Sequence, residues 1–189
     1  TEVTLKLLPL PPYRAALSVG MSSIAAAAKG LRRIFRAGFL PSALEIADEF
    51  TLKAATQRTG SRRLSGCRGH LIVELDGQEK SVRSELRDLK RLLESLKPRF
   101  VDQALGAETV EAIWQLRREF SYSLRDTGLV KLNEDIVVPR GCLQKLLAFT
   151  NRLQKKHGMP VACFGHAGDG NIHVNVMVND TQVGHEQRR

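Results

Sequence analysis

Hydrophobic and polar positions recur along the chain with two periods, one typical of strands and the other of helices. Alternating or continuous apolar residues predict strands over residues 2–10, 13–21, 42–48, 70–77 and 129–139, and two more on either side of residues 165–170. Apolar residues at helical spacing predict helices over 24–36, 49–57, 81–97, 109–125 and 141–158. Helices mixed with short hairpin connections indicate an α+β fold, with an antiparallel or mixed sheet covered by helices on one side.

The boundaries of these elements follow from residues that start or stop helices. Ser22 or Ser23 is expected to cap the first helix, and Gly158 is expected to end the last one. The polar, basic and glycine-containing stretch 59–69 is expected to be a loop.

Two of the predicted strands divide into an apolar face and a polar face. In the strand that begins at residue 171, the polar face holds Asn171, His173 and Asn175. In the strand over 129–139, it holds Lys131, Asn133 and Asp135. If the two strands are neighbours, these rows converge on one side of the sheet and suit a small anionic molecule. The alternative is that Lys131 and Asp135 form a surface ion pair of little energetic value.

The stretch GHAGDGNIH, residues 165–173, contains two histidines seven positions apart. Its glycines allow a tight turn that brings His166, at the end of one strand, near His173 on the next. A catalytic zinc needs three protein ligands and an open position, so these residues are either half of a metal site or a hairpin whose histidines face water. Asp169 is expected to brace the turn through backbone N–H groups.

An arginine interrupts the apolar stripe of the helix predicted over 109–125. Arg117 lies among the apolar positions of that stripe, so its guanidinium needs a partner. The partner is either an internal carboxylate, Glu134 or Asp135, or the carboxylate of a substrate, which matches the planar fork of arginine.

Composition narrows the class of protein and of partner. The 189 residues are 42% hydrophobic, which is enough to fill the core of a domain, and the formal net charge of +9 favours anionic partners. A basic ferredoxin-like module that binds RNA is one alternative. However, aromatic residues are only 5% of the chain, and the aromatic RNA-binding signature does not occur. We therefore expect no nucleic-acid partner.

Cysteine usage and the lack of targeting features indicate a cytoplasmic protein. Cys67, Cys142 and Cys163 are far apart and form no CxxC pair, so they are expected to be ordinary buried or half-buried thiols. No run of about 18 apolar residues occurs, and the start of the chain lacks the pattern of a signal peptide.

Three stretches resemble a known family. They are PSALEIAD, NEDIVVPRG and, most specifically, GHAGDGNIHVNV, and the resemblance extends over nearly the whole chain. They are similar to the C-terminal cap region of FAD-linked 2-hydroxyacid dehydrogenases, the group that contains the glycolate oxidase flavoprotein subunit, D-lactate dehydrogenases and D-2-hydroxyglutarate dehydrogenase. The resemblance implies a ferredoxin-like antiparallel sheet covered by helices, which lies over the flavin.

The same resemblance implies roles for particular residues. His166 and His173 match histidines that bind a divalent metal, which is Zn, Mn or Fe. Arg117 matches an arginine that pairs with the substrate carboxylate, Lys131 matches a lysine that does similar work, and Asn175 matches an asparagine that contacts substrate. No catalytic residue is assigned within the chain.

The family pattern also contains parts that this sequence lacks. An FAD-binding domain precedes the cap, and a downstream Gly-Glu-His-Gly motif supplies the third metal ligand and the catalytic base. The stretch GHEQ at 184–187 has its histidine and glutamate in the wrong order for that motif. We therefore expect residues 1–189 to be a single substrate- and metal-binding cap domain, truncated at both ends.

The function expected of the parent enzyme is oxidation of a small 2-hydroxy acid, of the glycolate or D-lactate type, to the 2-oxo acid. The expected partners are the FAD-binding domain of the same polypeptide and an iron–sulfur subunit that accepts electrons. The isolated chain is expected to be inactive. The alternatives are the RNA-binding module and an inactive truncated remnant.

Overall fold

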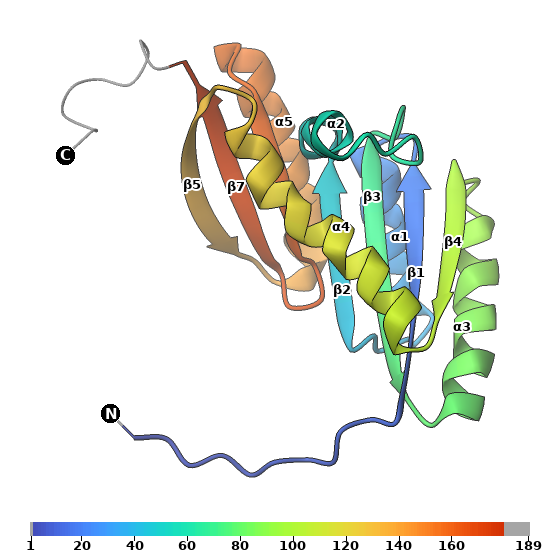
Figure 1. The fold of residues 1–189 in the computed structure, drawn as a ribbon. Helices are drawn as coiled ribbons and strands as arrows, with labels where there is room; N and C mark the ends of the chain where they lie inside the picture. Colours follow the sequence, from blue (N-terminus) through green and yellow to red (C-terminus); the bar gives the residue numbers. More distant parts are fainter. Residues whose placement is uncertain (1, 180–189) are drawn as a thin grey trace.

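The computed structural model describes residues 2–179 and arranges seven strands in one sheet, in the spatial order β4-β1-β3-β2-β6-β7-β5 (Figure 1). Every neighbouring pair of strands is antiparallel. The strands are β1 (Tyr13–Met21), β2 (Ala43–Asp48), β3 (Gly69–Gly77), β4 (Phe100–Leu105), β5 (Val130–Val137), β6 (Val161–His166) and β7 (Asn171–Val178). The helices are α1 (Ile24–Arg36), α2 (Glu49–Thr59), α3 (Glu79–Glu94), α4 (Ala107–Arg125) and α5 (Leu143–His157), and a 3-10 turn, η1 (Arg140–Cys142), precedes α5.

One half of the sheet has the ferredoxin-like arrangement. The elements β1, α1, β2, β3, α3 and β4 follow one another along the chain, with α2 inserted between β2 and β3, and their strands lie in the order β4-β1-β3-β2. Strands β6, β7 and β5 extend the same sheet beyond β2. The predicted α+β, ferredoxin-like antiparallel fold is therefore confirmed.

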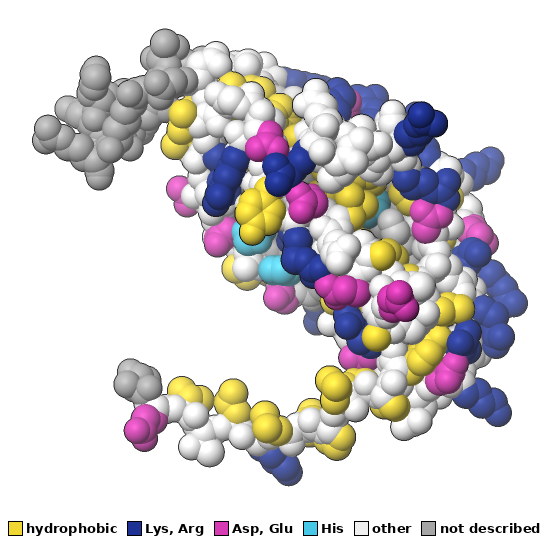
Figure 2. All heavy atoms as spheres, viewed as in Figure 1, with side chains coloured by type: hydrophobic (Ala, Val, Ile, Leu, Met, Phe, Trp, Pro, Cys, Tyr) yellow, Lys and Arg dark blue, Asp and Glu magenta, His cyan; other side chains and the backbone are white. Residues whose placement is uncertain are grey.

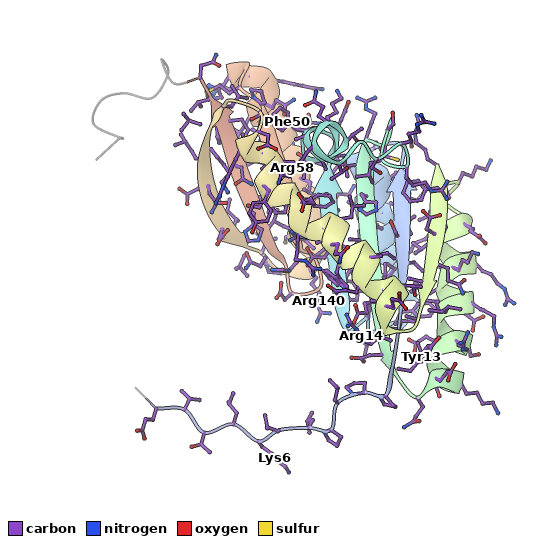
Figure 3. The ribbon with its side chains drawn as sticks, in the orientation of Figure 1. Lys6, Tyr13, Arg14, Phe50, Arg58 and Arg140 are labelled. Carbon is purple, nitrogen blue, oxygen red and sulfur yellow. The ribbon has the colours of Figure 1, made fainter. Side chains whose placement is uncertain are left out.

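Helices cover both faces of this sheet, whereas the sequence pattern had predicted cover on one side. Helices α1, α3 and α5 lie against one face, and α4 crosses the other face diagonally with α2 beside it (Figure 1). The reason is that the central strands are buried on both faces, as Ala16 and Leu17 are in β1. Arg58 on α2 links the two helices at the surface, because it bonds to Glu119 on α4 and to Asp126 directly after α4 (Figure 3).

The predicted strand over residues 2–10 is wrong. This segment pairs with no strand and extends away from the body of the molecule, with its apolar side chains uncovered (Figures 2 and 3). Leu5 is 74% exposed and Leu10 is 89% exposed. Apolar alternation alone does not make a strand, because the backbone also needs a hydrogen-bonding partner, and the prolines at 9, 11 and 12 lack the N–H donor.

The remaining predicted elements are found within a few residues of their predicted bounds, and one strand was missed. Strand β4 lies between α3 and α4 and pairs with β1. Ser23 caps α1, since its Oγ accepts a hydrogen bond from Ala26 N at 3.1 Å, and Gly158 ends α5 with a φ of 66°. Within residues 2–179, no helix is both long and apolar enough to cross a membrane. The three cysteines are free, two of them buried and one half-buried, as expected.

A neutral histidine lies in the core under α4. His70 on β3 is 1% exposed, and its Nε2 lies 2.8 Å from Ser18 Oγ on β1. Burial lowers the pKa of His70 to about 4, against an opposing effect of Asp102. His70 is therefore uncharged at neutral pH and packs among aromatic rings as part of the core.

Candidate functional site

The glycine-rich turn between β6 and β7 builds one end of the site. Gly170 has a φ of +88°, and a Cβ at this position would collide with the carbonyl oxygen of Val138. Asn171 N donates to Asp169 Oδ1 at 3.1 Å, so Asp169 braces the turn as expected. Ile172 is buried on the opposite face of β7. The turn therefore fixes the hairpin so that the histidines at either end share the face that α4 covers.

The two histidines of the motif lie together and are oriented by carboxylates. The ring centroids of His166 and His173 are 5.7 Å apart, with an angle of 74° between the ring planes. His173 Nδ1 lies 2.5 Å from Asp135 Oδ1, and His166 Nδ1 bonds to Glu45 Oε1. Each ring therefore uses Nδ1 within the protein, which leaves Nε2 of both rings available for another partner.

Glu45 is the acidic residue that links two of the predicted site residues. It lies on β2, where Glu45 faces His166 across the strand pair, and its side chain is only 4% exposed. Its Oε2 accepts a hydrogen bond from Arg117 Nε at 2.5 Å. The internal partner expected for Arg117 was Glu134 or Asp135. The partner in the structure is Glu45, because Arg117 lies where α4 passes above β2 and β6, although α4 contacts β5 as well.

Two aromatic rings, one on β6 and one on α4 itself, hold the guanidinium of Arg117 in place. Its Cζ lies 4.8 Å from the centroid of the Phe164 ring and 5.7 Å from that of Phe120. The Arg117 side chain is 11% exposed. Nε is used by Glu45, so the two Nη groups are the part of the fork that remains for a ligand.

The second polar row lies beside the first, so the condition on which the sequence interpretation depended is met. Strand β5 pairs with β7 so that Asp135 faces His173 and Asn133 faces Asn175. Hydrogen bonds from His173 and Asn133 lower the pKa of the exposed Asp135 carboxyl. Lys131 faces Met177, four register positions beyond the Asp135–His173 pair, and therefore lies at the far end of the row.

Asn175 is fully buried in the same row. Its Nδ2 donates to the carbonyl oxygens of Ala162 at 3.1 Å and His173 at 3.3 Å. Its Oδ1 has no hydrogen-bond partner among residues 2–179. The amide therefore braces the β6–β7 pair and leaves one acceptor unsatisfied.

A cavity of about 320 Å³ opens beside the histidine end of the site, and Glu45 and His166 line it. Within the described part of the chain, no group of three or more His, Cys, Asp or Glu side chains is arranged to hold a metal ion. The stretch GHEQ at 184–187 lies outside the described residues. The site thus combines a cationic fork, two oriented imidazoles and an adjacent cavity. Figure 2 shows histidine side chains (cyan) beside Lys or Arg side chains (dark blue) on the face that α4 crosses.

The sequence of this domain matches the family model for the C-terminal domain of FAD linked oxidases over residues 10–188. The chain belongs to this family. The predicted resemblance is therefore confirmed at the level of the family.

Two curated relatives of this FAD linked oxidase domain are 25% or more identical to it. Glycolate oxidase subunit GlcD of Escherichia coli (strain K12) is 28% identical over 186 residues, which are 97% of this chain and 37% of the relative. D-lactate dehydrogenase of Anaerostipes hadrus is 25% identical over 194 residues, which are 97% of this chain and 40% of the relative. The chain therefore spans less than half the length of either relative.

Solved structures support the fold of this FAD linked oxidase domain. The structure of p-cresol methylhydroxylase with substrate bound matches with a TM-score of 0.63 at 14% identity, over 96% of this chain and 42% of that chain. At this identity the likeness concerns the fold alone.

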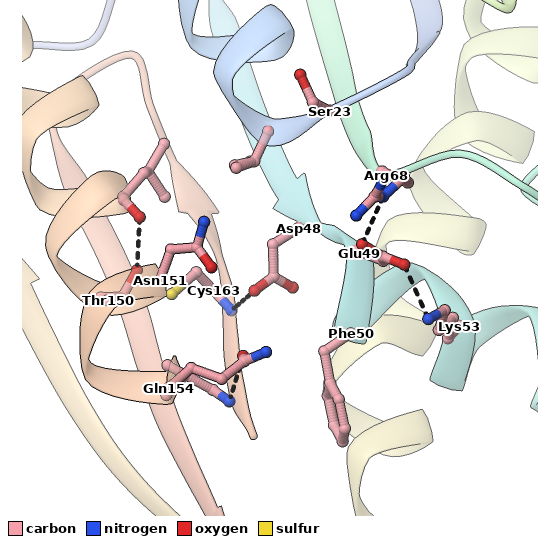
Figure 4. A pocket seen from close by; sticks show the side chains of 13 residues that line it. Ser23, Asp48, Glu49, Phe50, Lys53, Arg68, Thr150, Asn151, Gln154 and Cys163 are labelled. Atoms are coloured by element: carbon pink, nitrogen blue, oxygen red, sulfur yellow. Dashed lines mark hydrogen bonds and ion pairs between the residues drawn. The ribbon is translucent and has the colours of Figure 1, made fainter. Parts of the chain in front are cut away.

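A second, larger cavity of about 340 Å³ lies at the end of β2, between α1, α2 and α5 (Figure 4). Asp48 projects into it, caps α2 through Thr51 N at 3.0 Å, and accepts a hydrogen bond from Cys163 N at 2.8 Å. Burial raises the pKa of Asp48 to about 6, although these hydrogen bonds act in the opposite direction. Glu49 at the rim is paired with Lys53 and Arg68, so the charged groups of this cavity are paired with each other or with backbone.

Proposed function

We propose that this domain supplies the substrate- and metal-binding side of an FAD-dependent dehydrogenase that oxidises a small 2-hydroxy acid of the glycolate or D-lactate type. The observation that carries the proposal is the convergence of Arg117, His166 and His173 on one face of the sheet, held there by Glu45 and Asp135. Family membership favours this oxidoreductase over a basic RNA-binding module.

Arg117 binds the substrate carboxylate in this proposal. Glu45 holds Nε, and the rings of Phe164 and Phe120 limit movement of the guanidinium plane. The two Nη groups then present parallel N–H donors, which match the two oxygens of a carboxylate. Binding in this way fixes the orientation of the carbinol carbon before reaction.

His166 and His173 hold a divalent metal, Zn, Mn or Fe, in this proposal. A metal-binding histidine commonly donates its other ring N–H to a carboxylate, which fixes the ring and leaves one nitrogen for the metal. Glu45 and Asp135 fulfil that role here at the two Nδ1 atoms. The two imidazoles therefore fit two positions of a metal site, and the remaining ligands have to come from outside residues 2–179.

FAD, bound chiefly by another domain, supplies the capacity to accept hydride from the substrate. The residues of this chain bind and orient the hydroxy acid. Asn175 and Lys131 remain predicted substrate contacts, and Asn175 Oδ1 is a buried acceptor without a partner among residues 2–179. The iron–sulfur partner and the cytoplasmic location remain predictions as well.

The function is tested by dye reduction with a polypeptide in which this chain follows a flavin-binding domain. We expect reduction with glycolate or D-lactate, and neither yellow colour nor turnover from the 189-residue chain alone. A flavin-loaded polypeptide that oxidises no 2-hydroxy acid would contradict the proposal. Flavin retention or turnover by the chain alone would contradict the expectation that another domain binds most of the FAD. It would favour an activity contained within this chain.

The metal site is tested by titrating Mn²⁺ into the 189-residue chain. We expect weak, reversible binding, because a catalytic site normally has three protein ligands and residues 2–179 offer two. His166→Ala and His173→Ala are each expected to weaken that binding at least tenfold. His157→Ala, at the exposed end of α5, is the matched control and is expected to change nothing. Unchanged binding in both motif variants would show that the histidines are not ligands.

A further inference from the structure

Helix α1 exposes a continuous cationic stripe. Lys29, Arg32, Arg33 and Arg36 recur at i, i+3, i+4 and i+7, and all four are exposed. The buried residues of α1, such as Leu31, lie on the opposite side and pack against the sheet. No acidic residue occurs between residues 24 and 42. The stripe therefore points away from the sheet and has no acidic side chain on its own segment to offset it.

Helix α5 exposes a second stripe of the same kind, with an aromatic residue within it. Lys145, Phe149, Arg152 and Lys156 follow one another at i, i+4, i+7 and i+11 on the side opposite the buried Leu147. Phe149 is 49% exposed, and the Arg152 guanidinium lies 5.9 Å from the centroid of its ring. Residues 139–160 contain no acidic side chain.

The two stripes form one surface, which we call the basic face. Helices α1 and α5 are neighbours on the side of the sheet opposite α4 (Figure 1), and Arg32 of α1 donates to Gln144 of α5 at 2.6 Å. None of the seven cations of the basic face is in an ion pair with another residue of the described range 2–179. The adjacent helix α3 differs, because its cations alternate with acids and pair with them, as Arg83 does with Glu79.

We propose that the basic face docks this domain on an anionic phospholipid surface. Cations unopposed by acids attract such a surface, and an exposed aromatic among them is the combination with which surface helices enter the headgroup region. The basic face lies on the opposite side of the sheet from Arg117 and His166, so docking leaves the candidate site uncovered. The proposal rests on charge and exposure alone and does not depend on the proposed reaction.

The test is co-sedimentation of the 189-residue chain with vesicles of phosphatidylcholine, with and without phosphatidylserine. We expect binding only to the vesicles that contain phosphatidylserine, and weaker binding as salt is raised. Each Lys or Arg near such a surface contributes about fivefold in affinity, equivalent to ~1 kcal/mol. Replacing Lys29, Arg36, Lys145 and Lys156 by Gln is therefore expected to weaken binding at least about a hundredfold.

The matched control removes the same number of positive charges from α3. Lys80, Arg83, Arg87 and Arg91 are replaced by Gln in this variant, which is expected to bind nearly as well as the unaltered chain. Phe149→Gln is expected to weaken binding severalfold, because the aromatic contact with the headgroup region is lost. Circular dichroism melting confirms that each variant is folded before its binding is compared.

Three results would overturn the proposal. The first is no binding to vesicles with phosphatidylserine. The second is equal loss of binding in the two quadruple variants, which would mean that net charge alone is responsible. The third is salt-sensitive binding of single-stranded RNA or an acidic polypeptide that is tighter than binding of the vesicles, which would assign the basic face to another class of polyanion.

Discussion

Replacing Arg117 by lysine is expected to lower kcat/KM for the hydroxy acid about 10- to 100-fold in the flavin-loaded polypeptide. Lysine keeps the positive charge next to Glu45, but it loses the two parallel Nη donors that we propose for the substrate carboxylate. A hydrogen bond to a charged group contributes about 1.5–3 kcal/mol, which corresponds to this range. Steady-state kinetics with D-lactate or glycolate measures the change.

A neighbouring arginine provides the control for this experiment. Arg118→Lys alters the next residue of α4, whose guanidinium pairs with Glu111 at the surface, and is expected to leave kcat/KM unchanged. The melting temperature of Arg117→Lys is expected to stay close to that of the unaltered polypeptide. A variant that melts early but keeps normal kinetics would assign Arg117 to a structural ion pair alone.

Glu45→Gln is expected to lower the free energy of unfolding by about 3 kcal/mol. Glu45 is 4% exposed and Arg117 is 11% exposed, so removing the carboxylate leaves a guanidinium charge buried without its partner. Glutamine also keeps only one acceptor oxygen, so it can no longer accept from both Arg117 Nε and His166 Nδ1. Urea denaturation followed by circular dichroism measures the loss.

Two further variants show whether the loss arises from the buried pair. Glu49→Gln removes a more exposed carboxylate, paired with Lys53 and Arg68, and is expected to cost less than about 1 kcal/mol. The double variant Glu45→Gln with Arg117→Gln is expected to be less destabilised than the sum of the single variants, because it leaves no unpaired buried charge. Strict additivity, or a loss no larger than that of Glu49→Gln, would contradict this interpretation.

The sequence was sufficient to predict elements that have a strong hydrophobic period and residues that start or stop the element at their ends. Helix α3 has its apolar residues on one face, and α5 ends at a glycine with positive φ. Strand β4 was missed because it is only six residues long and carries Asp102 and Gln103 in its middle. Its pairing with β1 depends on a contact with a distant part of the chain, which local periodicity does not contain.

Most residues of the candidate site could be predicted from the sequence, but the contacts between them could not. The polar rows on β5 and β7 follow from strand alternation, but the pairing of these two strands, which the structure shows, does not follow from the sequence pattern. Glu45 was missed because it lies in a short apolar segment, where its neighbours Leu44 and Ile46 indicate only a buried strand. An acid inside such a segment was the available signal, since a buried carboxylate needs a partner. Its pairing with Arg117 requires knowing that α4 crosses above β2.

The opposite pKa shifts of His70 and Asp48 affect how the fold exchanges protons with solvent. The pKa of His70 falls from its ordinary 6.5 to about 4, so alone it would stabilise the fold at neutral pH and lose that contribution as the pH falls through this interval. The pKa of Asp48 rises from 3.8 to about 6, so alone it would favour the fold in acid and lose that contribution as the pH rises through 6.

Together the two residues form a compensated pair. Between about pH 4 and 6, the unfolded chain binds one proton at His70, whereas the folded chain binds one proton at Asp48. Because both states then hold the same number of protons on the pair, its net contribution to the pH dependence of stability is close to zero in this interval. In this interval the proton of the pair is on His70 of β3 in the unfolded chain and on Asp48 at the end of β2 in the folded chain.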